Sequence, residues 1–373
     1  MHKRSMFAAL VVLLLPSVAL ADYAALGTET YIVSPLVPNG GAADGSLIVP
    51  NGAGPYPLLV LSHGFSATAD NQRAWGLHFA SYGFVVVVPT FPNTYSPNHT
   101  VNAGIVQQLV ALYTNAGTAS PAQGKVDAAR VGLEGHSAGG LATTLAAAQL
   151  KPQAVVLFDP VDANDLAKPV YATLCSPVLD LFAGASSCNN QAGWKPFAGT
   201  AQGPVLFADV VGSNHCDGEN APRSLCGPFC GGGGADAGRQ KVYARWATAM
   251  FLAYLKNDAS AAATLAKGPM SADPGLSGVT VQTAPTCVVS GSDAGVDGSV
   301  GPVDASTPKD SGPTAKDSGG TDSGGGLDGG PDGATPGNEA GCACHTASGE
   351  SSGGGPLGFV AVALALLGFR RRR

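Results

Sequence analysis

Histidine is scarce in this sequence, with 7 residues in 373, and the 20 basic residues are outnumbered by 26 acidic ones. No segment combines a cluster of basic residues with aromatic residues for base stacking, so we do not expect nucleic-acid binding. Long apolar runs are missing too. The runs at 6–15 and 357–369 are both shorter than the roughly 20 residues that a stable membrane-spanning helix needs.

The start of the chain has the pattern of an export signal. His2, Lys3 and Arg4 form a basic start, the apolar run follows, and Ala-Leu-Ala at 19–21 gives the small residues that a signal peptidase accepts. We therefore predict a signal peptide over 1–21 and an exported protein. The alternative is a membrane-anchoring helix, which the shortness of the apolar run disfavours.

The composition of the chain changes abruptly at about residue 288. Segment 288–341 consists mostly of Gly, Asp, Ser, Pro, Ala and Thr, which bury too little apolar surface to offset their conformational entropy, and so predicts a disordered linker. Segment 342–373 holds Cys342, Cys344, the second apolar run and four terminal Arg. This combination resembles the C-terminal sorting signals of myxobacterial surface proteins and implies outer-surface attachment; an uncut, weak tail anchor is the alternative.

The remaining segment, 22–287, has the size of one α/β domain. It holds six cysteines, and an exported chain meets an oxidising compartment, so we expect disulfides while the pairing stays open. The pair Cys226 and Cys230 has no second pair with histidines at zinc-site spacing, so we expect no metal. The six cysteines are Cys175, Cys188, Cys216, Cys226, Cys230 and Cys287.

Short apolar runs alternate with helical patterns along this domain. Continuous apolar runs are typical of strands buried on both faces of a parallel sheet. The alternation predicts a mostly parallel, doubly wound α/β sheet flanked by helices, with antiparallel edge strands near 31–33 and 46–49. The predicted strands are 58–61, 84–88 (ended by Pro89), 129–133, 154–158, 178–182 and 205–207, and the predicted helices are 71–82, 101–115, 137–150 and 239–256.

One motif points to chemistry. Segment 135–140 reads Gly-His-Ser-Ala-Gly-Gly and lies directly between a predicted strand and an Ala-rich helix. This is the context of a nucleophile elbow, in which flanking glycines permit a strained turn that exposes the serine hydroxyl at a helix N-terminus. We predict Ser137 as the nucleophile; an ordinary helix-capping serine is the alternative.

A serine alcohol needs a base, which an acid orients. Only His215 and His345 follow Ser137, and His215 comes after a predicted late strand, so it is the predicted base. Asp159, at the end of the strand 154–158, is the predicted acid. Other candidates are Asp162, Asp165, Asp180, Asp209 and Asp217.

Further residues are expected around the ester. The backbone N–H groups of Ala138 and Phe65 are the predicted oxyanion hole, since Phe65 lies in the loop after an earlier strand. The predicted substrate contacts are Phe65, His136, Asp162 and Trp194. We expect His63, in the same loop as Phe65, to support that loop.

Three segments carry a family resemblance. Segments 61–65 (Leu-Ser-His-Gly-Phe), 80–89 (Ala-Ser-Tyr-Gly-Phe-Val-Val-Val-Val-Pro) and 135–140 resemble the chlorophyllases and, equally, the cutinase-like polyester hydrolases and dienelactone-hydrolase relatives. After the elbow, Asp159-Pro-Val resembles the chlorophyllase segment with the catalytic Asp, whereas polyester hydrolases place theirs in the loop at 184–188, which here has none. The resemblance, over about 48–255, implies an α/β-hydrolase fold and supports Ser137, Asp159 and His215 as a triad.

The sequence thus predicts a secreted or surface-attached serine hydrolase of carboxylic esters that works through an acyl-enzyme. We expect it to be monomeric and to need no metal or organic cofactor. Two alternatives remain: a surface binding or adhesion protein on a hydrolase scaffold, and a peptidase or acyltransferase that uses the same triad.

Overall fold

The computed structural model describes residues 22–221, 226–230, 233–283 and 287. The predicted signal peptide 1–21, linker 288–341 and sorting tail 342–373 lie outside the described residues. Every structural statement below concerns the described part of the chain.

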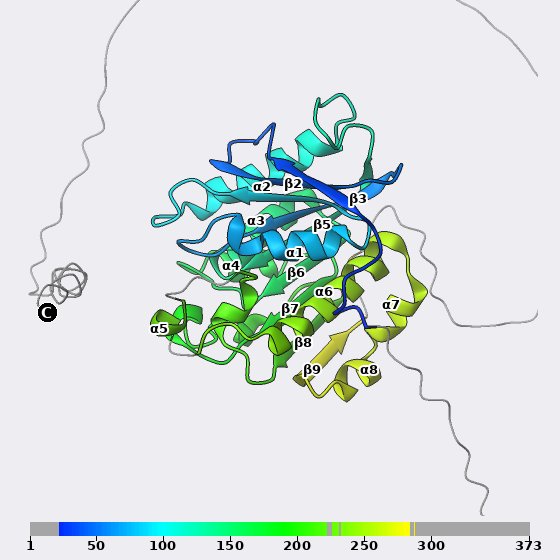
Figure 1. The fold of residues 1–373 in the computed structure, drawn as a ribbon. Helices are drawn as coiled ribbons and strands as arrows, with labels where there is room; N and C mark the ends of the chain where they lie inside the picture. Colours follow the sequence, from blue (N-terminus) through cyan, green and yellow to red (C-terminus); the bar gives the residue numbers. More distant parts are fainter. Residues whose placement is uncertain (1–21, 222–225, 231–232, 284–286, 288–373) are drawn as a thin grey trace, which may run out of the picture. The chain divides into compact units, whose positions relative to one another are not determined.

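A nine-stranded sheet forms the centre of the fold, with strand order β1-β2-β4-β3-β5-β6-β7-β8-β9 (Figure 1). The six strands from β4 to β8 in this order pair in parallel, whereas β1, β2 and β9 join antiparallel at the two edges. The expectation of a mostly parallel sheet is confirmed. The strands are β1 Tyr31–Pro35, β2 Asp44–Pro50, β3 Tyr56–Ser62, β4 Val85–Thr90, β5 Val126–His136, β6 Ala154–Phe158, β7 Val178–Phe182, β8 Val205–Val210 and β9 Leu276–Gln282.

Helices cover both faces of this sheet. The four long helices differ from the sequence prediction by one or two residues at their ends. The α-helices are α1 Asp70–Ala80, α2 His99–Thr114, α3 Ala138–Leu150, α4 Ala167–Tyr171, α5 Cys226–Cys230, α6 Ala237–Lys256, α7 Ala259–Thr264 and α8 Lys267–Ala272, and the 3₁₀ turns are η1 Ser187–Asn189, η2 Lys195–Phe197 and η3 His215–Gly218. None of these helices is both long and apolar enough to cross a bilayer.

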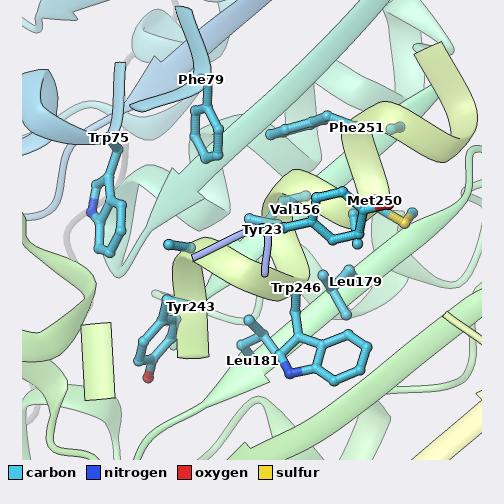
Figure 2. Packing of buried hydrophobic residues seen from close by; sticks show 14 of the residues in the cluster. Tyr23, Trp75, Phe79, Val156, Leu179, Leu181, Tyr243, Trp246, Met250 and Phe251 are labelled. Atoms are coloured by element: carbon cyan, nitrogen blue, oxygen red, sulfur yellow. The ribbon is translucent and has the colours of Figure 1, made fainter. Parts of the chain in front are cut away.

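The apolar strand runs divide between two cores. Leu59 and Leu61 of β3 belong to the core under α1 and α6, and Leu58 and Val60 belong to the core under α2 and α3. Successive strand side chains point to opposite faces, so a strand covered on both faces needs apolar residues at every position. Figure 2 shows the first core, where rings from α1 and α6 meet above strand residues such as Val156.

Strand β4 continues past the predicted stop at Pro89 and ends at Thr90. Its parallel pairing with β3 covers only Val85, Val86 and Val87, so the missing N–H of Pro89 removes no bond to β3. Edge strand β9 was not predicted. Only its first residue, Leu276, is buried, so it lacks a continuous apolar run.

Candidate active site

Backbone sterics shape the turn at Ser137. This residue has φ 55° and ψ −125° between β5 and α3, a conformation that few non-glycine residues adopt. A Cβ added to Gly135 would lie 2.5 Å from the carbonyl oxygen of Gly139 and from Thr143 Oγ1. One added to Gly139 would lie 2.2 Å from the carbonyl oxygen of Ser62 on β3. Glycine is therefore required on both sides of the serine.

Three distant side chains meet at the carboxyl ends of the parallel strands. The imidazole of His215 accepts a hydrogen bond at Nε2 from Ser137 Oγ over 2.9 Å and donates from Nδ1 to Asp159 Oδ2 over 2.6 Å. All three side chains are buried, with residues 2–6% exposed. Asp159 follows β6 directly and has φ 41°, and His215 begins η3 after β8. The structure thus brings together the three residues that the sequence selects, in the order hydroxyl, imidazole, carboxylate.

Asn189, which the sequence did not predict as a site residue, contacts the carboxylate of Asp159. Its amide nitrogen donates to Asp159 Oδ1 over 3.2 Å and to Oδ2 over 3.0 Å. The backbone N–H of Ala183 also donates to Asp159 Oδ1, over 3.1 Å. Asn189 lies in η1, inside the loop that carries no carboxylate. That absence was the only sequence signal that another polar group acts there.

The loop that carries His215 is fixed by Asp217. This fully buried carboxylate accepts hydrogen bonds from the backbone N–H groups of Asn214 and Asp236, from the Ser213 hydroxyl, and from Arg239 Nε over 2.6 Å. Asp217 was considered as a triad acid, but the structure shows its oxygens engaged in bracing η3 against α6.

Two of the three disulfides lie beside the loops of this site. Cys188 pairs with Cys230, Cys216 with Cys226, and Cys175 with Cys287. The sulfur atoms of Cys216, Cys226 and Cys230 lie within 4.8 Å of one another. Because all three are in disulfide bonds, they present no thiolate to a metal ion. The expectation of disulfides is met, and their pairing could not be deduced from spacing.

The loop after β3 lies directly against the nucleophile. A Cβ added to Gly64 would be 3.0 Å from Ser137 Cβ and 3.5 Å from Ser137 Oγ. Phe65 follows Gly64, so its backbone lies near Ser137, and Ala138 begins α3 directly after the serine. His63 supports this loop, since its Nδ1 donates to the Gly64 carbonyl over 2.8 Å and its Nε2 accepts from the Phe91 backbone N–H over 2.9 Å.

The predicted substrate contacts are distributed differently than expected. Phe65 is 50% exposed and offers apolar surface beside Ser137. His136 is instead fully buried beneath His215, with ring centroids 4.7 Å apart, and its Nε2 donates to the His215 carbonyl over 2.9 Å. Trp194 is 1% exposed and packs in the core against Phe197. His136 and Trp194 are therefore not exposed to a substrate, and the prediction that they contact it is wrong.

Asp162 has a structural contact as well. Its carboxylate accepts the backbone N–H groups of Ala167 and Lys168 at the start of α4, over 2.8 and 3.1 Å. This pattern satisfies N–H groups that a helix start leaves without an intrahelical partner.

Two other candidate acids are engaged elsewhere. Asp180 lies within β7, accepts the Tyr171 hydroxyl over 2.6 Å, and is so deeply buried that its pKa rises to about 7. Asp209 forms an ion pair with Lys195.

Residues 39–179 match the family model of the chlorophyllases. The matched part contains Ser137 and Asp159 and ends before His215. Together with the mostly parallel sheet flanked by helices, the match assigns the α/β-hydrolase fold to this chain and supports a hydrolase that acts on esters. The likeness to polyester hydrolases and the surface-sorting tail stay predictions.

Proposed function

We propose that this protein is a serine hydrolase of carboxylic esters that works through a covalent acyl-enzyme. The observation that carries the proposal is the continuous hydrogen-bonded chain from Ser137 Oγ through the His215 imidazole to the Asp159 carboxylate. A hydroxyl on a strained turn, joined to a base that a carboxylate orients, is the arrangement that activates serine for acyl transfer.

In the proposed first step, His215 Nε2 takes the proton of Ser137 as Oγ attacks the ester carbonyl carbon. The backbone N–H groups of Phe65 and Ala138 stabilise the negative oxygen of the tetrahedral intermediate. His215 then gives the proton to the leaving alcohol. Asp159 keeps Nδ1 protonated and stabilises the charged imidazole.

In the second step, His215 removes a proton from water, and the resulting hydroxide attacks the acyl-enzyme. Collapse of the second tetrahedral intermediate releases the acid and returns the proton to Ser137 Oγ. Neither step calls for a metal or an organic cofactor. A peptide in place of the ester, or a second alcohol in place of water, would use the same three groups.

Hydrolysis of p-nitrophenyl esters from acetate to long acyl chains tests the proposal, with the oxidised full-length protein and its Ser137→Ala variant side by side. Loss of a triad serine lowers kcat by about five to six orders of magnitude while the fold is retained. Covalent labelling by a fluorophosphonate should likewise vanish in the variant. Undiminished turnover by Ser137→Ala would refute the mechanism.

The same labelling separates an enzyme from a surface binding protein, because a binder needs no activated serine.

We further propose that the protein is exported and attached to the outer surface, on the basis of the composition of 1–21 and 342–373. Fractionation of cells that express the full chain, beside a variant without 342–373, tests this: the shortened protein should appear in the medium rather than on the surface.

A further inference from the structure

We infer that Asn189 is a positioning residue for Asp159, and that the Cys188–Cys230 disulfide holds Asn189 in place, so that turnover depends on this one covalent bond. The inference rests on the proposed function, since it concerns the orientation of the proposed acid. It goes beyond that function by adding a fourth side chain and a redox-sensitive support to the three groups already described.

The amide of Asn189 has only one orientation that satisfies its surroundings. Its oxygen accepts the backbone N–H groups of Ser186 over 2.8 Å and Ala192 over 3.0 Å. Its nitrogen must therefore face the other way, where it donates to both oxygens of Asp159 and to the Gly184 carbonyl, the last over 2.9 Å. Asn189 is 1% exposed, so water does not compete for these groups. Every donor and acceptor of the amide is used.

Asp159 needs this partner because it is buried at the end of a strand. The residue is 2% exposed, has φ 41° and directly follows β6. Among the described residues, it accepts hydrogen bonds from His215 Nδ1, the Ala183 N–H and the Asn189 amide. Asn189 is the one side-chain donor among them besides the base itself. Without it, the carboxylate can rotate away from the line that aligns the imidazole with Ser137.

The segment that carries Asn189 is short, so a bond to another element is needed to fix its position in the domain. Turn η1 has three residues, and 3₁₀ turns of this length have weak internal hydrogen bonding. Cys188, the residue before Asn189, is bonded to Cys230 of α5. On the other side of the site Cys216, the residue after His215, is bonded to Cys226 of the same helix. Helix α5 thus ties the loop of the positioning residue to the loop of the base.

The two disulfides are close enough to exchange. Cys226 Sγ and Cys230 Sγ are 3.8 Å apart. A dithiol reductant that opens Cys188–Cys230 is itself oxidised to a disulfide and leaves two thiols. The thiolate of Cys230 can then attack Cys226 Sγ, so that a Cys226–Cys230 bond forms, the Cys216–Cys226 bond breaks and Cys216 departs as a thiolate. A single Cys188→Ser variant would present the same reactive Cys230, so both cysteines must be replaced together.

The first test compares Asn189→Ala with Asn190→Ala in the full, oxidised chain. Asn190 is the exposed neighbour and donates to the Asp162 carbonyl rather than to Asp159. Asn189→Ala should lower kcat by about 10- to 100-fold, the scale expected for a misplaced catalytic group, with KM changed much less. Asn190→Ala should keep the wild-type kcat. Equal kcat values for wild type and Asn189→Ala would overturn the inference, as would an equal fall in both variants.

The second test compares two disulfide deletions. Cys188→Ser/Cys230→Ser should lose about 10-fold or more in kcat at temperatures where near-ultraviolet circular dichroism shows a folded protein. Cys175→Ser/Cys287→Ser removes the third disulfide, which joins neither loop of the site, and should lower Tm while leaving kcat unchanged. Unchanged kcat in the first pair, or equal loss in both pairs, would refute the disulfide's role. If the first pair does not fold at any assay temperature while Cys175→Ser/Cys287→Ser does, the Cys188–Cys230 disulfide stabilises the whole domain, and its specific role in holding Asn189 is refuted.

Ser137→Ala, measured in parallel, separates this inference from the proposed function. If the wild-type protein neither hydrolyses esters nor labels with fluorophosphonate, the proposed function fails and the inference falls with it. If the wild type is active, Ser137→Ala is inactive and Asn189→Ala matches the wild type, only the positioning role is refuted.

Discussion

Different kinds of contact fix the nucleophile and its two partners in position. Around Ser137 the constraint is local and steric: Gly135 and Gly139 admit close contacts with α3 and β3 that any side chain would prevent. Around Asp159 and His215 the constraint is long-range and polar, supplied by an amide, buried carboxylates and disulfides from separate loops. A motif of a few residues can encode the first kind of support, whereas the second exists only once the chain has folded.

A substitution that breaks the steric constraint around Ser137 should have the largest effect on folding and activity. A Cβ at Gly139 would lie 2.2 Å from the Ser62 carbonyl oxygen and 2.5 Å from that of His63, and both are backbone atoms that cannot move aside cheaply. We expect Gly139→Ala to destabilise the fold by more than about 3 kcal/mol and to abolish activity, which urea unfolding and ester hydrolysis would measure.

Gly104→Ala in α2 is the matched control for this change. Apart from its chain neighbours and the backbone of its own helix, no described atom lies within 4 Å of the Cβ position at Gly104, which is well inside α2. The same substitution there should stabilise the protein by about 0.5–1 kcal/mol through helix propensity. A tolerated Gly139→Ala would show that the turn is less tightly constrained than its contacts imply.

The polar side should show an intermediate effect. Asp217→Asn replaces an acceptor of four hydrogen bonds with an amide that repels some of the same donors, so η3 and His215 should shift. We expect kcat to fall by about 10- to 100-fold.

Helix α6 supplies a matched control for Asp217. Arg245 of α6 and the buried Asp273, which directly follows α8, form a similar ion pair, and neither is bonded to the triad. Asp273→Asn should therefore lower Tm without lowering kcat in assays at a temperature where the protein stays folded. Equal kcat loss in both variants would mean that α6 as a whole, rather than Asp217, positions the base.

The smallest effect on turnover is expected at Asp180, a carboxylate outside both supports, where the change should appear in stability against pH instead. Burial raises the pKa of Asp180 from 3.8 to about 7, so between these values the folded protein keeps a proton that the unfolded chain has released. Stability therefore falls as pH rises through this window, by up to roughly 4 kcal/mol from this group. Asp180→Asn should flatten the decline.

Urea unfolding of both proteins at several pH values between 4 and 8 measures that difference. Burial lowers the pKa of His78, which has the opposite sign: its contribution is lost as pH falls below 6.5. Because His78 is present in both proteins, its contribution cancels in the comparison. Parallel stability curves for wild type and Asp180→Asn would contradict the assignment.

The division between local and long-range support also decides what could be predicted from sequence. The apolar runs of β6 and β7 and the elbow at Ser137 each consist of consecutive residues, so the sequence pattern alone predicts their positions. The scarcity of histidine made His215 easy to select. Asn189 could not be found, because its role depends on a turn that brings it back to Asp159, and an Asn in a loop carries no distinctive pattern.

Burial explains the positions that differ from expectation. His136 and Trp194 were assigned to the substrate from their chemical character, but the fold places one beneath the base and the other in the core. Whether a large side chain lines a cleft or fills the interior depends on the path of loops that sequence periodicity does not describe. Strand β9 was missed for another reason: only Leu276 in it is buried, so it lacks the continuous apolar run of the interior strands.

The disulfide between Cys175 and Cys287 has a mechanical consequence. Any tension applied to the chain beyond residue 287 enters the domain at Cys287 and passes through a covalent bond to Cys175, just ahead of the interior strand β7. Edge strand β9 is thereby shielded from being peeled off the sheet. If the domain were held by its C-terminal end in flowing liquid, the covalent Cys175–Cys287 bond would carry the force. Without this disulfide, the hydrogen bonds between β8 and β9 would carry it instead.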